Sequence, residues 1–208
     1  RQAGSELSLE PESELWPDAS LGMLLDDVTG AQKGEVYVTW RAHRVTLWRG
    51  HFDELRRLHD VVQRRGAERR LLARVFCVVR RYMTLADLKS GTQAALPDAT
   101  FALLRAEFGV THELFASPLN RSRHLDHFGS LFPDVDGFFG STGSFFDFEL
   151  RAGSYEANPP FDRASCELAF AHAAAALART NPLGARHALS VVVVVPKFDG
   201  FEPSRDVP

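Results

Sequence analysis

The stretch that decides the predicted fold is Leu189-Ser-Val-Val-Val-Val-Val195, which ends in five consecutive valines. A strand with apolar residues on both faces is typical of a parallel sheet covered by helices on each side. The alanine-rich segment at about 162–179 predicts a long helix before it. Further strands are expected at 154–157 and 112–116. The alternation of strand and helix predicts an α/β, doubly wound fold.

Weaker patterns lie between the two upstream strands. A helix is expected around 122–131, after the turn Ser117-Pro-Leu-Asn120. Short strands are expected at 135–139 and 144–148, where apolar side chains cluster. These segments complete the predicted α/β pattern.

The N-terminal half of the chain has a different pattern. Residues 35–40 and 44–48 are β-rich and alternate, which predicts a short hairpin. Helical spacing then predicts three helices, from about 51 to Gly66, over 71–82, and from Pro97 to Gly109. We therefore expect an acidic, disordered tail at 1–20, a hairpin and helical domain at 21–108, and an α/β core at 109–208.

Composition limits the classes of protein to consider. The chain has 208 residues, 45% of them hydrophobic, and a formal net charge of −3. There is no apolar run of about 18 residues and no signal-peptide pattern, so we expect an intracellular protein without a membrane partner. Cys77 and Cys166 are interpreted as reduced, packed thiols, and no His or Cys pair has metal-ligand spacing. We predict no metal. The start at Arg1 indicates a fragment.

Arginines are concentrated between Arg56 and Arg81, at positions 56, 57, 64, 65, 69, 70, 74, 80 and 81. Only Asp60 and Glu68 oppose them within that window. The guanidinium group binds phosphate through paired hydrogen bonds, so the cluster is compatible with nucleic acid binding. Solvated helix faces are the alternative interpretation, and the cluster alone does not decide between the two.

The turn Asn158-Pro159-Pro160-Phe161 follows one predicted strand, and Ser117-Pro118-Leu119-Asn120 follows another. Ligands of doubly wound folds bind beyond such strand ends. Asn158 offers a side-chain carbonyl and Pro159 a backbone carbonyl, and these two groups can accept the protons of an adenine amine. Consecutive prolines lack N–H donors and fix φ, so the turn is rigid. Phe161 offers a face for an unstacked base.

This turn predicts an adenine-N6 methyltransferase that uses S-adenosylmethionine. The amine nitrogen is a weak nucleophile, so much of the rate must come from holding it in line with the methyl–sulfur bond. With average residue usage, an Asn-Pro-Pro-aromatic string arises in roughly one chain of this length in several hundred. The alternative interpretation is a proline-rich turn that closes a strand. Its position between a strand and a helix favours the enzyme.

Three longer stretches resemble the catalytic core of the phosphorylated-CTD-interacting-factor family, whose members are cap-specific mRNA (2′-O-methyladenosine-N6) methyltransferases. The stretches are 108–120, Phe-Gly-Val-Thr-His-Glu-Leu-Phe-Ala-Ser-Pro-Leu-Asn; 132–141, Phe-Pro-Asp-Val-Asp-Gly-Phe-Phe-Gly-Ser; and 153–161, Gly-Ser-Tyr-Glu-Ala-Asn-Pro-Pro-Phe. The resemblance extends from about His51 to Phe198. It implies a Rossmann-like class I methyltransferase core behind a hairpin and helical domain, S-adenosylmethionine as donor, capped RNA as acceptor, and a nuclear location.

The resemblance also implies roles for single residues. Asn158, Pro159, Pro160 and Phe161 match the catalytic motif without change. The cofactor is expected to contact Phe115, Ala116, Ser117, Pro118, Asn120 and Asp147. Asp147 could equally be a turn residue at a strand end. The substrate is expected to contact Glu156, Arg80 and Arg81, although Glu156 could instead support another contact.

The sequence also departs from the family and from this fold class. The loop at 115–120 lacks the glycine-rich form that usually holds the cofactor. Trp16, Trp40 and Trp48 do not have the spacing of a WW module, so a phosphorylated polymerase tail would bind through parts absent here. The chain ends at Pro208, where this fold class normally adds two strands. Two alternatives therefore stay open: methylation of uncapped RNA or DNA, and a non-catalytic, truncated homologue that binds RNA or the polymerase tail.

Overall fold

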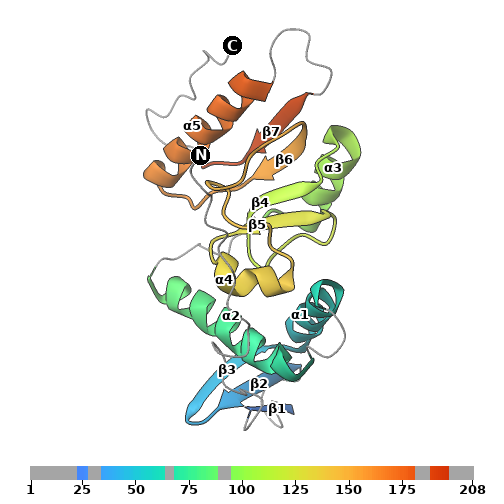
Figure 1. Cartoon of the computed structure of the whole chain (residues 1–208), viewed down its shortest axis with the longest axis vertical. Coiled ribbons are helices and arrows are strands. Elements are labelled where there is room, and N and C mark those ends of the chain that lie inside the picture. The colour runs from blue at the N-terminus through green and yellow to red at the C-terminus, as the bar shows by residue number, and fades with distance from the viewer. Residues whose placement is uncertain (1–22, 28–33, 64–67, 89–94, 181–187, 197–208) are drawn as a thin grey trace, which may run out of the picture.

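The computed structural model of the protein describes residues 23–27, 34–63, 68–88, 95–180 and 188–196. They form two units at opposite ends of an elongated molecule (Figure 1). The N-terminal unit contains a three-stranded antiparallel sheet, and the second unit, which we call the core unit, contains a four-stranded parallel sheet. The predicted acidic tail and the predicted helix end at Gly66 lie outside the described residues.

The sheet of the N-terminal unit consists of β1 (Met23–Asp27), β2 (Glu35–Trp40) and β3 (His43–Trp48). β2 and β3 form the predicted hairpin, and Arg41 takes a positive φ of 54° in the tight turn between them. The sequence does not predict β1, because Met-Leu-Leu-Asp-Asp lacks the alternation of a half-buried strand. Pairing with β2 along all five residues makes it a strand.

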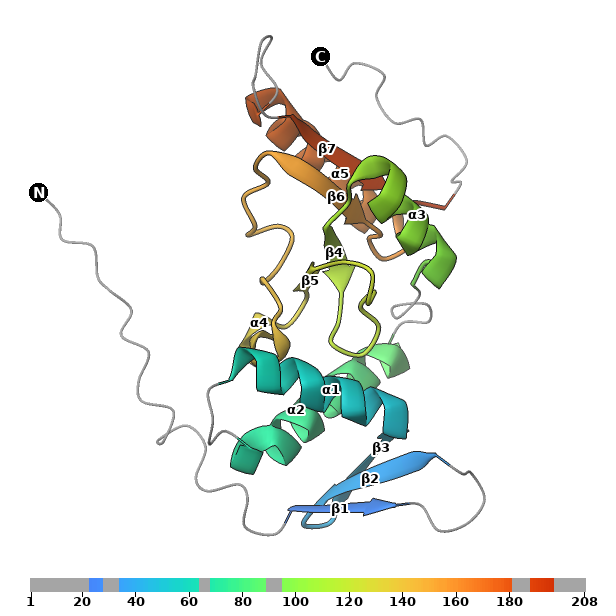
Figure 2. The same ribbon diagram turned by 90° about the vertical axis from the view of Figure 1, so that its right-hand side faces the viewer.

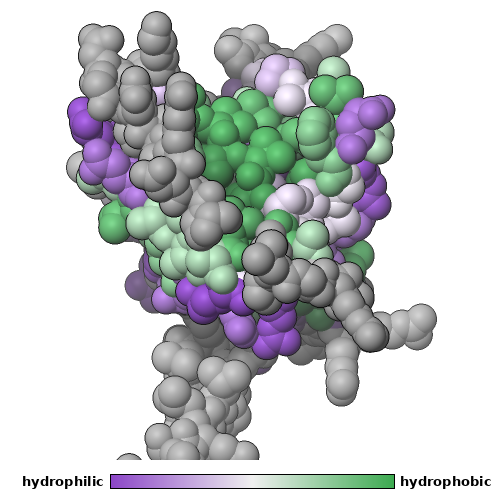
Figure 3. Space-filling model, turned by 90° about the horizontal axis from the view of Figure 1, so that it is seen from above, coloured by the Kyte–Doolittle hydropathy of each residue, from purple (hydrophilic) through white to green (hydrophobic). Residues whose placement is uncertain are grey.

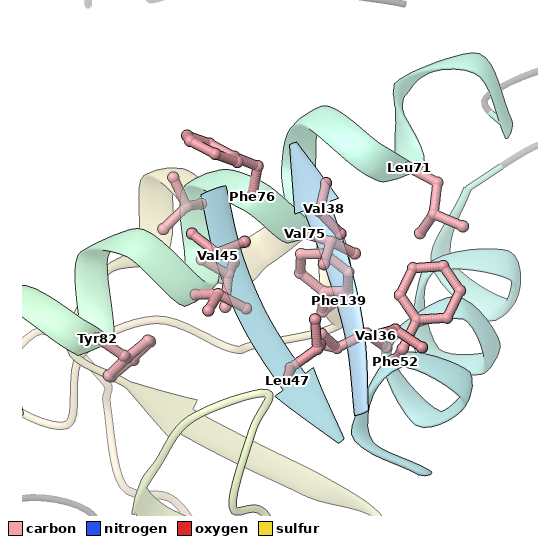
Figure 4. Packing of buried hydrophobic residues seen from close by; sticks show 14 of the residues in the cluster. Val36, Val38, Val45, Leu47, Phe52, Leu71, Val75, Phe76, Tyr82 and Phe139 are labelled. Atoms are coloured by element: carbon pink, nitrogen blue, oxygen red, sulfur yellow. The ribbon is translucent and has the colours of Figure 1, made fainter. Parts of the chain in front are cut away.

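Two helices, α1 (Arg49–Val62) and α2 (Glu68–Leu88), pack against this sheet and confirm the first two predicted helices. Their apolar residues recur every three to four positions, so one face of each helix is buried. Figure 4 shows side chains of β2, β3, α1 and α2 meeting in one continuous core. Phe139, which is fully buried in the same core, comes from the core unit.

The parallel sheet consists of β4 (His112–Ala116), β5 (His127–Ser130), β6 (Gly153–Ala157) and β7 (Leu189–Val193). Their order is β5-β4-β6-β7, so the chain order reverses beside β4. The helix α3 (Asp98–Phe108) covers one face and α5 (Arg163–Thr180) covers the other (Figure 2). This arrangement confirms the α/β class with a parallel sheet.

Three predictions for the middle of the core unit are wrong. The segment 122–131, expected to be helical, contains β5, because the backbone N–H groups of Asp126 and His127 bond to Thr111 and bring the chain beside β4. The strand expected at 135–139 is replaced by the short helix α4 (Pro133–Asp136) and the 3₁₀ turn η1 (Gly137–Phe139). Proline at the first position of a helix favours this outcome.

The third error concerns 144–148, which forms turns instead of a strand. The backbone N–H of Asp147 bonds to the Ser144 carbonyl, and that of Phe148 bonds to the Phe145 carbonyl. Phe145 and Phe148 still pack in the apolar cluster beneath α5. The apolar composition therefore reflects burial rather than strand pairing.

α3 begins at Asp98, directly after Pro97, and Gly109 ends it in the left-handed conformation, as predicted. The sequence grouped this helix with the N-terminal domain. In the structure, its buried Phe101 and Leu104 pack with Val110, Leu125 and Val192 of the core unit. α3 therefore covers the sheet that carries the candidate site.

β7 differs from its prediction in burial. The apolar run indicates a strand covered on both faces, but residues 191–195 are only half-buried. β7 is the last strand of the described sheet. Figure 3, which views the end of the molecule where α5 and β7 lie, shows a hydrophobic patch in the centre of this surface. Among the described helices, none combines the length and the apolar character that crossing a bilayer requires.

Candidate active site

The motif Asn158–Phe161 lies between the end of β6 and the start of α5. Asp162 fixes the start of the helix, because its carboxylate accepts the backbone N–H of Ser165 at 2.9 Å and the Ser165 hydroxyl at 2.7 Å. The backbone N–H of Asp162 in turn donates to the Pro160 carbonyl at 2.8 Å. The motif is therefore held at both ends by regular structure.

All four motif residues line one cavity of about 280 Å³. The carboxyl ends of β4 and β5 form its opposite side. Phe115 and Ala116 end β4 and Asn120 follows in the next turn, while Ser130 ends β5 and Leu131 follows it. The cavity thus lies where ligands of doubly wound folds bind, beside the strand at which the chain order reverses. The sequence predicts this meeting of the two turns, but not the contribution of β5.

Aromatic side chains dominate the wall around the motif. The Phe161 ring is 51% exposed and the nearby Phe146 ring is 44% exposed, while Pro159 is buried. Phe145 lies 4.9 Å from Phe115, measured between ring centroids. Exposed aromatic faces at a cavity are suited to stacking with a heterocyclic base and to attracting a cation.

The turn after β4 is rigid because its side chains bond to its own backbone. The Asn120 side-chain oxygen accepts the Ser117 backbone N–H at 2.7 Å and the Ser117 hydroxyl at 2.8 Å. The Ser117 hydroxyl oxygen accepts the Leu119 N–H at 3.2 Å. Ser117 is only 1% exposed, so it supports the turn. Among the predicted cofactor contacts, Phe115, Ala116 and Asn120 line the cavity, and Ser117 does not.

The structure places two other predicted cofactor residues elsewhere. Pro118 lines a neighbouring groove, described below, and not the cavity. Asp147 is exposed in a turn outside the described lining of both spaces. The sequence placed it at the end of a strand, but this segment does not form one. Their roles as cofactor contacts stay predictions from the resemblance.

Glu156 lies on the opposite face of β6 from its neighbours Tyr155 and Ala157, which pack toward α5. It pairs in register with Glu113 on β4, and both side chains are at most 2% exposed. Burial raises the pKa of Glu156 to about 8, with a further contribution from the Glu113 charge. Burial likewise raises the pKa of Glu113 to about 7, although the Ser122 N–H donates to its carboxylate at 2.7 Å.

The carboxyl oxygens of Glu156 make no hydrogen bond within the described part of the chain. Glu156 is also absent from the described lining of the cavity. The sequence predicts a substrate contact or a supporting role for this residue. Both roles stay predictions.

A second, larger space of about 840 Å³ lies between the two units. This groove is lined by β3, α1, α2, the start of α3 and the loop 118–123. Trp48 is 50% exposed at its edge, and Arg121 and Arg123 contribute positive charge. Tyr82 and Asn120 line both the groove and the cavity. The sequence does not predict the groove, because its walls come from segments far apart in the chain.

Tyr82 is buried on α2 and bonds to the core unit. Its hydroxyl donates to the Asp136 carboxylate at 2.6 Å, and its ring lies 5.2 Å from that of Phe132. Asp136 is fully buried, and burial raises its pKa despite the hydrogen bonds from Tyr82 and Ser130. Sequence reasoning places Tyr82 in a buried helix but gives no sign of this partner, which is 54 positions away.

Three described arginines of the cluster form ion pairs or other contacts within the fold. Arg81 pairs with Asp134 at 3.1 Å, and Arg80 is exposed on α2. Neither residue appears in the described lining of the cavity or the groove, so their predicted contact with substrate stays a prediction. Arg74 is buried, with its guanidinium 2.8 Å from His59 and its charge 3.9 Å from the centre of the Phe138 ring. Arg57 pairs with Glu54.

The predictions about cysteines and metal can be compared with the described residues. Cys77 and Cys166 are both free thiols. Within the described ranges, no cluster of three or more His, Cys, Asp or Glu side chains is arranged to hold a metal ion.

Comparison with known proteins places this geometry in a family. Residues 54–205 match the family described as "Phosphorylated CTD interacting factor 1 WW domain", a range that includes most of α1, all of α2, the parallel sheet and the motif. The mouse and human proteins named mRNA (2′-O-methyladenosine-N(6)-)-methyltransferase are each 39% identical over 132 residues. The match covers 61% of this chain and 18% of each relative, so it spans about a fifth of their length. The chain belongs to the phosphorylated CTD interacting factor 1 family.

Proposed function

We propose that this chain carries the methyl-transfer site of an S-adenosylmethionine-dependent adenine-N6 methyltransferase that acts on RNA, at the 2′-O-methyladenosine beside the mRNA cap. One observation carries the proposal: all four residues of Asn158–Phe161 line a cavity at the carboxyl ends of the parallel strands. The names of the mouse and human relatives support the acceptor. A nuclear location and a phosphorylated polymerase tail as partner belong to the same proposal.

The chemistry follows from the groups that face the cavity. The Asn158 side chain and the Pro159 carbonyl accept the two protons of the adenine amine, which favours a pyramidal nitrogen with an available lone pair. Phe161 stacks against the base and keeps it beside these acceptors. A nitrogen that has accepted a methyl group is cationic and loses its proton readily, so the site needs no strong general base.

The residues around the cavity fit the cofactor. The sulfonium group carries a positive charge, and the aromatic faces of Phe115, Phe145 and Phe146 attract cations. Ser130, at the end of β5, provides a hydroxyl group for a ribose, and the rigid turn at Asn120 bounds the other side. When bound, the cofactor supplies an electrophilic methyl group. These residues orient it and exclude water.

The test is transfer of a radiolabelled methyl group to capped RNA that begins with 2′-O-methyladenosine. Asn158→Ala is expected to lower kcat/KM by about 100-fold or more, because one acceptor of the amine is lost. Asn158→Asp keeps an acceptor oxygen and is expected to retain more activity. Equal transfer by wild type and Asn158→Ala contradicts the role of this residue, and absence of transfer by the wild-type chain contradicts the proposed activity.

Two further measurements address the alternatives. Capped RNA, uncapped RNA and DNA of one sequence, compared as acceptors, distinguish the cap-adjacent adenosine from other adenines. Calorimetry with S-adenosylhomocysteine distinguishes an enzyme from a non-catalytic binding module, since the module is expected to show no binding. The cavity lined by the complete motif favours the enzyme.

A further inference from the structure

Tyr82 lies at the boundary between the cavity and the groove. It lines both spaces, together with Asn120, although it belongs to α2 and the motif belongs to the core unit. Leu85, one turn further along the same face of α2, also lines the cavity. The N-terminal unit thus supplies one wall of the candidate active site.

The Tyr82 ring is held in place from two sides. Its hydroxyl is bonded to Asp136, and the Phe132 N–H donates to the same carboxylate oxygen at 3.3 Å. Phe132 also contacts the Tyr82 ring edge to face. Ser130, which lines the cavity at the end of β5, lies close enough to the Asp136 carboxylate to lower its pKa. Tyr82 is only 4% exposed, so its ring forms a fixed wall and not a mobile gate.

We propose that Tyr82 is a positioning residue for the RNA chain: held by Asp136, its ring sets where the nucleotide leaves the groove and enters the cavity. This inference rests on the proposed function. The groove has two features that suit a nucleotide chain, namely the half-exposed indole of Trp48 and the exposed guanidinium group of Arg123, which pairs with Asp98. The Arg121 side chain is only 8% exposed and pairs with Glu54. A base that passes from there to Asn158 crosses the edge formed by Tyr82 and Asn120.

Two other roles for Tyr82 make different predictions. As a plain structural residue, it would affect folding stability, and its variants would lose cofactor binding and RNA binding together. As a cofactor contact, it would affect the dissociation constant of the cofactor. As a positioning residue for RNA, it changes KM for RNA while the affinity for the cofactor stays constant. Misplacement of a reacting group by about 1 Å can also lower kcat.

The experiment compares Tyr82→Phe, Tyr82→Leu and Asp136→Asn in methyl transfer to capped RNA and in binding of S-adenosylhomocysteine. Tyr82→Phe keeps the ring but loses its anchor, and we expect KM for RNA to rise about 3- to 10-fold. Tyr82→Leu loses the wall, and we expect a rise of more than about 30-fold. Asp136→Asn keeps an acceptor and is expected to change KM less than about threefold. The matched control is Tyr37→Phe, on β2, because Tyr37 belongs to the described lining of neither space.

A double variant, Tyr82→Phe with Asp136→Ala, completes the test. If Asp136 acts through Tyr82, the double variant raises KM no more than Asp136→Ala alone. Unchanged KM for RNA in Tyr82→Leu overturns the proposal, and so does a rise in the dissociation constant of S-adenosylhomocysteine equal to the rise in KM. If a variant fails to fold, Asp136→Asn and Tyr82→Phe at lower temperature give the same comparison. Absence of methyl transfer by the wild-type protein contradicts the proposed function; RNA affinity measured by fluorescence anisotropy then still tests Tyr82.

Discussion

The two units of the molecule are built from different kinds of interior. The N-terminal unit has one continuous apolar core of fifteen buried residues, two of which, Val135 and Phe139, come from the core unit, whereas the core unit has separate described clusters of eight and four. The parallel sheet itself separates these two clusters, since one packs beneath α5 and the other beneath α3, and its strands also bury the polar side chains of His112, Glu113 and Glu156. Buried polar groups lower stability unless they are paired. The N-terminal unit therefore stabilises the fold and supplies one wall of the cavity. The core unit buries polar side chains beside the motif, and these lower its stability.

The largest expected effect is on stability, and it comes from a substitution that removes a contact between the two units. Phe139, fully buried, belongs to η1 but lies in the core of the N-terminal unit and contacts the His59 ring. Phe139→Ala is expected to lower the free energy of unfolding by about 3–5 kcal/mol through the cavity it leaves. Chemical denaturation followed by circular dichroism measures this. A loss of less than about 1 kcal/mol would show that the two units fold independently of this contact.

The next effect concerns activity rather than stability. Phe161→Ala removes the exposed ring at the cavity, and base stacking is worth about 1–3 kcal/mol, so kcat/KM for RNA is expected to fall about 10- to 100-fold. Phe108→Ala is the matched control, because Phe108 is 58% exposed at the end of α3, away from the cavity. If both variants lose activity equally, the loss does not come from stacking at the motif.

Sequence reasoning succeeds where a pattern is local. The strand β7 in the valine run, the alanine-rich α5 and the Pro97–Gly109 limits of α3 are each determined by neighbouring residues, and the structure agrees with them. It fails at β5, where two hydrogen bonds to Thr111 decide the conformation. Leu125 and Phe128 are buried from a bend and a strand, so their apolar character does not indicate a helix.

The residues of the candidate site likewise include some that the sequence predicts and others that it does not. The motif and the end of β4 are local turns, so the sequence predicts both, and the structure brings them together in one cavity. Tyr82 and Ser130 reach the cavity only through tertiary contacts, and no spacing in the sequence reveals them. Glu156 is the intermediate case: its neighbours identify it as part of a motif, but only the pairing with Glu113 shows that it is buried.

A third prediction concerns the pH dependence of stability that buried Glu156 gives to the core unit. Burial raises the pKa of Glu156 in the folded protein to about 8 from an ordinary value of 4.5, so the folded state binds more protons across that window. Stability is therefore expected to fall as pH rises from about 4.5 to about 8. Glu156→Gln cannot ionise, so this loss, about 1–3 kcal/mol, should disappear and the slope should flatten. Urea denaturation at pH 5, 6.5 and 8 measures it. An unchanged slope would assign the dependence to other groups.

The smallest expected effect is on RNA binding, and it is tested by comparing two arginines that each pair with an aspartate. Arg123 pairs with Asp98 at 2.9 Å and lines the groove, whereas Arg81 pairs with Asp134 outside both spaces. Each pair is exposed, so alanine at either position should change stability by less than about 1 kcal/mol.

The difference between these two arginines should appear in RNA binding. Replacing a phosphate contact lowers the dependence of log K on log salt by about 1. Arg123→Ala is expected to lower the slope by this amount, because its guanidinium group faces the groove that is proposed to carry the RNA. Arg81→Ala is expected to leave the slope unchanged, since Arg81 does not belong to the described lining of the groove. The reverse result would place the RNA along α2, which is where the sequence alone predicts its phosphates, and would leave the groove without a role in guiding the nucleotide past Tyr82.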